Sequence, residues 1–200
     1  WKISCGADQG SIVKKGDTWT FKTSSNRCTG GIFKQRAEIK SGDVRPTIKG
    51  TYRFSSTISM TAKKRQKFDI FQIHDGRSSC APPLKVTVHP TGRIKLDSHY
   101  RTTSRKCEIN SSISGGTSAK RLSFNGKKHL LQIDISFDGK GGFGVIVRLD
   151  GKQQIKGQYN PPQGKNYFKS KRFYFKHGVY SRHPFEYVMT SGNMSVKKIK

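Results

Sequence analysis

The chain has 200 residues, enough for one domain with a substantial hydrophobic core. Its 39 Lys and Arg residues against 12 Asp and Glu residues give a net charge of +27, spread along the whole chain rather than gathered in a tail. No apolar run approaches the roughly 20 residues of a bilayer-spanning helix, and the first residues lack the charged-then-apolar layout of a signal peptide. This composition predicts a strongly positive surface and a polyanionic partner, for which nucleic acid, an anionic membrane and an acidic polysaccharide all qualify by charge.

Alternation of apolar and polar residues predicts short strands along the chain, over 35–40, 51–60, 68–74, 84–88, 94–96, 131–137, 143–149, 153–159 and 173–180. Turn sequences separate several of them, such as His89–Gly92 and Leu149–Lys152. Residues 111–120 and 160–166 are expected to be surface loops. The pattern predicts an all-β protein, a two-sheet antiparallel sandwich or jelly roll, with residues 1–200 as a single domain.

The four cysteines favour disulfides over a metal site. Cys5, Cys28, Cys80 and Cys107 lack the close spacing of a zinc knuckle. An even number at wide spacing is typical of a secreted, extracellular protein, although four free thiols are the alternative. We expect Cys5–Cys28 and Cys80–Cys107, because these pairings close the shorter loops. No metal and no other cofactor is predicted.

Three strands carry functional side chains on the face opposite their apolar residues. On the first strand, Arg36, Glu38 and Lys40 share a face. On the second, period two places Phe68, Ile70, Gln72 and His74 on one face and Asp69, Phe71, Ile73 and Asp75 on the other. On the third, Tyr174, Lys176, Gly178 and Tyr180 share a face. Taken singly, each pattern is typical of a solvated strand face, so it is their joint occurrence that indicates a site.

The three segments resemble the motifs of the family 7 alginate lyases, R-x-E-L, Q-[IV]-H and Y-F-K-A-G-x-Y-N-Q, in the same order. The matching stretches are Arg36–Ile39, Gln72–His74 and Tyr174–Tyr180. Departures are His177 in place of Ala, Ser181 in place of Asn, Arg182 in place of Gln, and Lys40 where a second Arg is common. The resemblance, which extends to the related glucuronan lyases, implies a β-jelly roll with a concave substrate groove. The departures leave the preferred uronic acid open.

The resemblance also implies a reaction, the cleavage of an acidic polyuronate by β-elimination. A base removes the proton on carbon 5, and the glycosidic oxygen leaves carbon 4, giving unsaturated uronic acid ends. Arg36 and Gln72 would neutralise the carboxylate, since guanidinium and amide groups suit that geometry. His74 suits the base and Tyr180 the acid, or Tyr180 serves as both, depending on the stereochemistry at carbon 5. The expected substrate-binding residues are Glu38, Lys40, Tyr174, Lys176 and Arg182, with Glu38 orienting Arg36 or Lys176 rather than reacting.

The partner is therefore expected to be an acidic polysaccharide, cut internally by a monomeric enzyme, with neither nucleic acid nor a membrane involved. The alternative is a non-catalytic module of the same fold that binds acidic polysaccharide. A nucleic-acid-binding protein is less favoured because no recognised motif is present, and a Ser-His-Asp hydrolase because Gly-x-Ser-x-Gly is absent. The charge also exceeds what one site needs, which suggests a further role in retention on an anionic wall or matrix.

Overall fold

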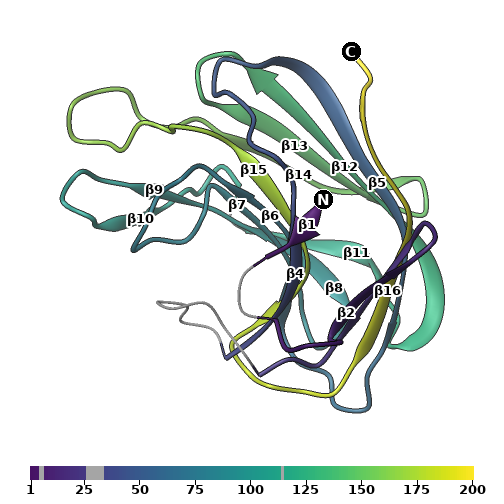
Figure 1. Ribbon diagram of the computed structural model, residues 1–200. Coiled ribbons are helices and arrows are strands. Elements are labelled where there is room, and N and C mark those ends of the chain that lie inside the picture. The colour runs from purple at the N-terminus through teal and green to yellow at the C-terminus, as the bar shows by residue number, and fades with distance from the viewer. Residues whose placement is uncertain (5–6, 26–33, 114) are drawn as a thin grey trace.

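The computed structural model describes residues 1–4, 7–25, 34–113 and 115–200. They form two seven-stranded antiparallel sheets, shown face to face in Figure 1. The front sheet has the strand order β1 (Lys2–Ile3), β4 (Gln35–Lys40), β15 (Tyr174–Ser181), β6 (Phe68–His74), β7 (Leu84–Val88), β8 (Arg93–Asp97) and β11 (Thr117–Arg121). The back sheet has the order β14 (Lys152–Tyr159), β13 (Phe143–Leu149), β12 (Asn125–Asp138), β5 (Lys49–Thr61), β16 (Val188–Lys198), β3 (Thr18–Lys22) and β2 (Ile12–Lys15).

The predicted all-β sandwich is confirmed, and most of the expected strands are present. The turn at His89–Gly92 connects β7 to β8 through a hydrogen bond from the His89 amide to the Arg93 carbonyl. One expectation is wrong, because part of the expected loop 111–120 forms β11, which pairs with β8. Among the described residues, no helix is long and apolar enough to cross a membrane.

Aromatic side chains fill the space between the two sheets. Phe54 of the back sheet lies 4.9 Å, centroid to centroid, from Phe71 of the front sheet, and Phe71 lies 5.7 Å from Phe175. Each fully buried phenylalanine contributes roughly 2–3 kcal/mol by leaving water. Because Phe71 and Phe175 face the back sheet, Gln72 on β6 and Tyr174 and Lys176 on β15 face outward, away from the core.

A two-stranded ribbon, β9 (His99–Arg101) with β10 (Cys107–Ile109), projects from the front sheet on the side away from the back sheet. Figure 1 shows the segment that precedes β15 projecting on the same side. The two are joined by the Thr102–Tyr167 bridge and by a hydrogen bond from the Phe168 amide to the Arg101 carbonyl. The expected Cys80–Cys107 disulfide is present and fastens the ribbon to the segment after β6. Cys5 and Cys28 lie outside the described residues.

Candidate active site

The three strands predicted to carry functional side chains are neighbours, in the order β4-β15-β6. Their register aligns Tyr180 with Arg36, and Tyr174 with His74. Lys176 stands between Lys40 on one side and Gln72 on the other. Gly178 permits this close pairing, since it has a positive φ of 140° and a Cβ at its position would clash with the Ala37 carbonyl oxygen. The structure therefore brings all four predicted catalytic residues onto the outward face of one sheet.

Glu38 is the centre around which the other side chains are arranged. It is only 1% exposed, and its Oε2 lies 3.4 Å from Arg36 Nε and 3.6 Å from Lys176 Nζ. Its Oε1 accepts a hydrogen bond of 2.5 Å from Gln72 Nε2. Its two oxygens are thus engaged by three neighbouring side chains, which the carboxylate orients. The sequence assigned Glu38 to the substrate-binding residues, and its burial favours the orienting role named beside that assignment.

Glu38 also fixes the orientation of Gln72 and, through it, the protonation of His74. A carboxylate only accepts hydrogen bonds, so the Gln72 amide nitrogen faces Glu38 and the Gln72 Oε1 faces His74 Nε2, 3.1 Å away. That oxygen accepts, so His74 Nε2 carries the hydrogen and His74 Nδ1 is left as the basic nitrogen. The His74 ring stacks on Tyr174 with centroids 5.1 Å apart and an angle of 14° between the planes.

Burial and positive neighbours shape the ionisation of this cluster. The pKa of His74 is lowered well below its ordinary value, mainly by loss of water and then by the charges of Lys176 and Arg36. Burial also lowers the pKa of Lys176, an effect that the Glu38 carboxylate partly offsets. His74 is thus neutral near pH 7 and able to accept a proton. An anionic ligand that neutralised the nearby cations would make His74 a stronger base.

The Arg36 guanidinium lies over the ring of Tyr180, 4.4 Å from its centroid. A cation in this position holds the phenol ring in place and attracts it electrostatically. Arg36 is 7% exposed, so its planar group is held between Glu38 and Tyr180. This arrangement leaves little conformational freedom to lose when a carboxylate binds.

One residue of the site, Asp69, was missed by the period-two interpretation of β6. The pairing of β6 with β7 shifts between Asp69 and Phe71, which pair with the consecutive residues Thr87 and Val86. This β-bulge reverses the alternation, so Asp69 faces outward with Gln72, and Phe68 packs in the core against Phe124. Asp69 is paired in register with Tyr180. Periodicity alone could not locate the bulge, although an acidic residue inside an apolar strand was a usable signal.

The remaining predicted residues lie at the borders of the cluster. Lys40 is at the strand end that pairs with the edge strand β1. Arg182 follows β15, is exposed, and lines a cavity of about 370 Å³ together with Asp69 and Lys85. The predicted residues thus extend along the sheet from Lys40 on β4 to Arg182 beside this cavity.

The segment after β6 supports the projecting ribbon through a buried ion pair. Asp75 is fully buried and accepts hydrogen bonds from Arg77 Nε at 2.8 Å and Nη2 at 2.6 Å. Arg77 also donates to the His99 carbonyl and the Tyr159 hydroxyl, and Ser170 Oγ donates to Asp75. The sequence indicated only a turn at Asp75, whereas the structure places an anchor for both projecting segments there.

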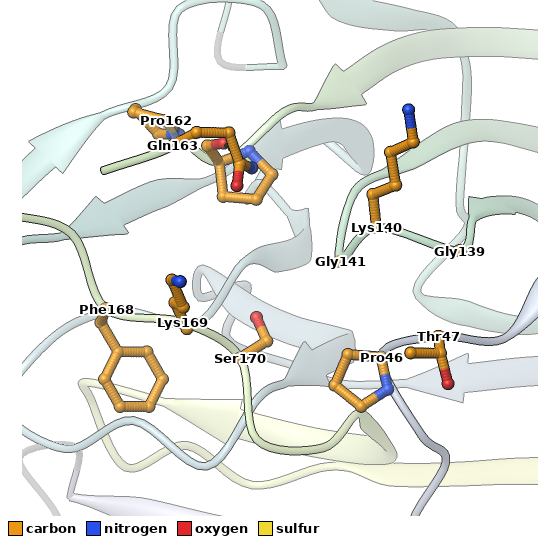
Figure 2. Close-up of a pocket in the computed structure, with 11 residues that line it drawn as sticks. Pro46, Thr47, Gly139, Lys140, Gly141, Pro162, Gln163, Phe168, Lys169 and Ser170 are labelled. Atoms are coloured by element: carbon orange, nitrogen blue, oxygen red, sulfur yellow. Dashed lines mark hydrogen bonds between the residues drawn. The ribbon is translucent and has the colours of Figure 1, made fainter. Parts of the chain in front are cut away.

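A second cavity, of about 240 Å³, lies beside Ser170 and is lined by none of the predicted site residues. Figure 2 shows Pro162 and Gln163 on one side of it, Pro46 and Thr47 on the opposite side, and Lys140 extending from the β12–β13 hairpin. Its lining includes Lys140, Lys169 and Ser170 but no histidine, tyrosine or carboxylate. It carries no part of the chemistry described above.

Ser123, His129 and Asp150 form a hydrogen-bonded chain away from this cluster, with Ser123 Oγ 3.1 Å from His129 Nε2 and His129 Nδ1 3.0 Å from Asp150 Oδ2. The order matches that of a hydrolase triad. However, the Ser123 backbone amide also donates to His129 Nε2, and Asp150 also accepts from the Leu130 amide. These hydrogen bonds connect β12 to the turn after β13, so we assign the Ser123–His129–Asp150 network a structural role.

Comparison with solved structures identifies the architecture. An alginate lyase from Alteromonas sp. 272 superposes with a TM-score of 0.60 at 14% identity, covering 98% of this chain and 93% of that one. An alginate lyase from Pseudomonas aeruginosa gives 0.59 at 16% identity, covering 96% and 87%. The endo-β-1,4-glucuronan lyase from Trichoderma reesei gives 0.58 at 13% identity, covering 98% and 87%. No protein-family model and no curated protein matches the sequence.

The chain has the fold of the jelly-roll alginate and glucuronan lyases. The resemblance that the three motifs implied is thus confirmed for the architecture along nearly the whole chain. At 13–16% identity the superposition shows the fold and leaves the roles of individual residues as proposals. In the described part of the chain, no three His, Cys, Asp or Glu side chains gather in a way that could hold a metal ion.

Proposed function

We propose that this protein is a polyuronate lyase that cuts an acidic polysaccharide of the alginate or glucuronan type by β-elimination. The observation that supports this most is the buried Glu38, which orients Arg36, Gln72 and Lys176 around one point on the sheet. His74 and Tyr180 flank the same face. A module that only binds polymer has no need for a neutral histidine on the same sheet face as a phenol that is held by a guanidinium.

In the proposed reaction, the substrate carboxylate lies against Arg36 and the second amide hydrogen of Gln72. Their charge and hydrogen bonding stabilise the negative charge that develops when the carbon 5 proton leaves. His74 Nδ1 or the Tyr180 phenolate takes that proton, the double bond forms between carbons 4 and 5, and the bond from carbon 4 to the glycosidic oxygen breaks. The Tyr180 hydroxyl then protonates the departing oxygen. Lys176, Lys40 and Arg182 hold neighbouring carboxylates, and Tyr174 supports His74.

The same proposal includes internal cleavage by a monomeric, single-domain enzyme that works outside the cell. The Cys80–Cys107 disulfide favours an oxidising compartment, because such bonds rarely persist in the cytosol. The net charge of +27 favours encounter with a polyanion.

The direct test is incubation with polymannuronate, polyguluronate, mixed alginate and glucuronan, followed by the ultraviolet absorbance of the unsaturated ends. We expect absorbance to rise with at least one polymer and viscosity to fall early, as internal cleavage requires. No rise on any polyuronate with a folded protein would refute the enzyme and leave the binding module.

Tyr180→Phe tests the assignment of the proton donor. It removes one hydroxyl and keeps the ring beneath Arg36. We expect cleavage to fall by roughly 10²–10⁴-fold, the usual contribution of general acid–base catalysis, with polymer binding retained. A variant that cleaves at the wild-type rate would show that another group protonates the leaving oxygen.

A further inference from the structure

The cavity beside Tyr180 is a cationic pocket with one acidic residue in it. It lies between the start of β6, strand β7 and the segment after β15, and its lining residues are Lys67, Phe68, Asp69, Lys85, Arg182 and His183. Lys85 is held in place by Asp97, with Nζ 2.7 Å from Oδ2. The pocket therefore presents a fixed ammonium group, two further cations and room for a small polar group.

Asp69 stands out because a carboxylate is unexpected where an anionic polymer would lie. It is 2% exposed, and its Oδ1 accepts a hydrogen bond from Thr87 Oγ1. Within the described residues its Oδ2 makes no hydrogen bond, and Lys85 Nζ is 3.9 Å from it. Burial raises the pKa of Asp69 to about 6, against the opposing effect of Lys85.

We propose that this pocket is a second uronate subsite, in which a carboxylate next to the one held by Arg36 and Gln72 binds Lys85, Lys67 and Arg182 while Asp69 takes up a proton. The inference rests on the proposed function, since it assumes a polyuronate chain in the groove. A protonated Asp69 no longer repels the incoming carboxylate. Polymer binding is then coupled to the uptake of a proton at one identified group.

The charged and titratable groups that face Asp69 come from every neighbouring element: Lys85 of β7, Asp97 of β8, Glu38 of β4, Tyr180 of β15, and Lys67, Arg182 and His183 at the cavity wall. His183 is the one histidine among them. It is exposed, so its replacement gives a clean comparison.

The size of the effect follows from proton linkage. A bound carboxylate that raises the pKa of Asp69 from about 6 to about 7 makes binding about tenfold tighter at about pH 5 than at about pH 8. At about pH 6.5 the protonated fraction then rises from roughly a quarter to roughly three quarters, so about half a proton is taken up for each ligand bound.

The experiment is calorimetry on the Tyr180→Phe protein, which holds its ligand without cutting it, titrated with short oligomers of mannuronate, guluronate or glucuronate. Two buffers of different ionisation enthalpy report the protons taken up. We expect about half a proton near pH 6.5, its loss when Asp69→Asn is added, and its retention when His183→Asn is added instead. Asp69→Asn keeps the Thr87 hydrogen bond, and its affinity should depend on pH much less than that of the parent protein.

Arg182→Gln, at an exposed position, is a second variant that does not depend on Asp69→Asn folding. It should weaken oligomer binding at least threefold. Unchanged affinity in this variant, no proton uptake by the parent protein, or uptake that disappears with His183→Asn would each overturn the subsite. If the wild-type protein cleaves polymer but one of these results is found, only the subsite fails. If no uronate oligomer binds and no polymer is cleaved, the proposed function fails with it.

Discussion

The histidine at position 177 leads to a sharp prediction about folding stability and pH. Its side chain is fully buried between the sheets, with Nδ1 2.9 Å from the Ile70 carbonyl oxygen and Nε2 2.8 Å from Ser191 Oγ. Since the carbonyl only accepts, Nδ1 carries the hydrogen and Nε2 accepts from the hydroxyl. Phe21 and Phe54 contact the ring, and burial lowers the pKa of His177 to about 4.

The sign follows from comparing folded and unfolded chains. An unfolded histidine has a pKa of about 6.5, so as the pH falls the unfolded chain binds its proton before the folded one. The stability that neutral His177 provides is therefore complete above about pH 6.5 and is lost as the pH falls toward 4. Between about pH 7 and about pH 5 the loss is about 2 kcal/mol, at 1.36 kcal/mol for each pKa unit.

Asp69 acts in the opposite direction. Its folded-state pKa of about 6 is above the unfolded value, so the folded chain binds this proton first. Acidification from about pH 7 to about pH 5 then adds about 1 kcal/mol of stability, and rising pH removes it again. The two buried groups largely offset each other, which conceals both in the wild-type protein.

Urea unfolding at about pH 5 and about pH 7 separates the two groups. In His177→Gln, the change in unfolding free energy on acidification should be about 2 kcal/mol more favourable than in the wild type, whatever the variant's absolute stability. In Asp69→Asn it should be about 1 kcal/mol less favourable. His183→Gln, at an exposed position, is the matched control. A His177→Gln protein with the wild-type pH dependence would show that His177 is not held neutral.

Three further predictions concern the site. Glu38→Gln leaves Arg36 and Lys176 without their carboxylate and should lower the unfolding free energy by about 3 kcal/mol. The control is Glu186→Gln, which makes the same change in charge at an exposed position and should alter the unfolding free energy little. Equal effects of the two substitutions would contradict the central role of Glu38. Arg36→Lys keeps the charge but loses the planar contact with Tyr180, so kcat/KM on polyuronate should fall roughly 10- to 100-fold with the melting temperature nearly unchanged. Polymer binding and retention on anionic wall material should both weaken at least about tenfold between about 50 mM and about 500 mM salt, and indifference to salt would remove the explanation offered for the charge.

The sequence predicted the parts of the fold that repeat locally. Alternation located β5, β7, β12 and β13, since a strand that buries one face must alternate. The Cys80–Cys107 pairing, predicted because it closes a shorter loop than the alternative pairings, is the one that the structure contains. Arg36 and Tyr180 were both predicted on the polar faces of their strands, and they are in contact because those strands are neighbours in the sheet. Strand order was not evident from the pattern, because β4, β15 and β6 are far apart in the chain.

What the sequence could not supply was the position of irregularities and partners. The bulge at Asp69 turns an apparent core-facing position outward. A strict two-residue alternation assumes a regular strand, so it cannot predict the extra residue of a bulge. The strand β11 was missed because its residues, Thr-Ser-Ala-Lys-Arg, show no alternation of apolar and polar side chains, and their pairing with β8 depends on the tertiary fold. Asp75 was interpreted as a turn residue because its hydrogen bonds with Arg77 and Ser170 form only in the folded chain and are not evident in the sequence.

The scarce acidic residues explain how so basic a protein can have an ordered site. Cations in close proximity repel one another and tend to extend into water, which would leave a groove of mobile side chains. Here several of the few carboxylates each lie beside a cation: the buried Glu38 beside Arg36 and Lys176, the buried Asp69 and half-buried Asp97 beside Lys85, and the buried Asp75 beside Arg77. Each fixes the position of a positive group without neutralising the face above it. A polyanion then meets cations that are already placed, and less conformational entropy is lost on binding than with free lysines.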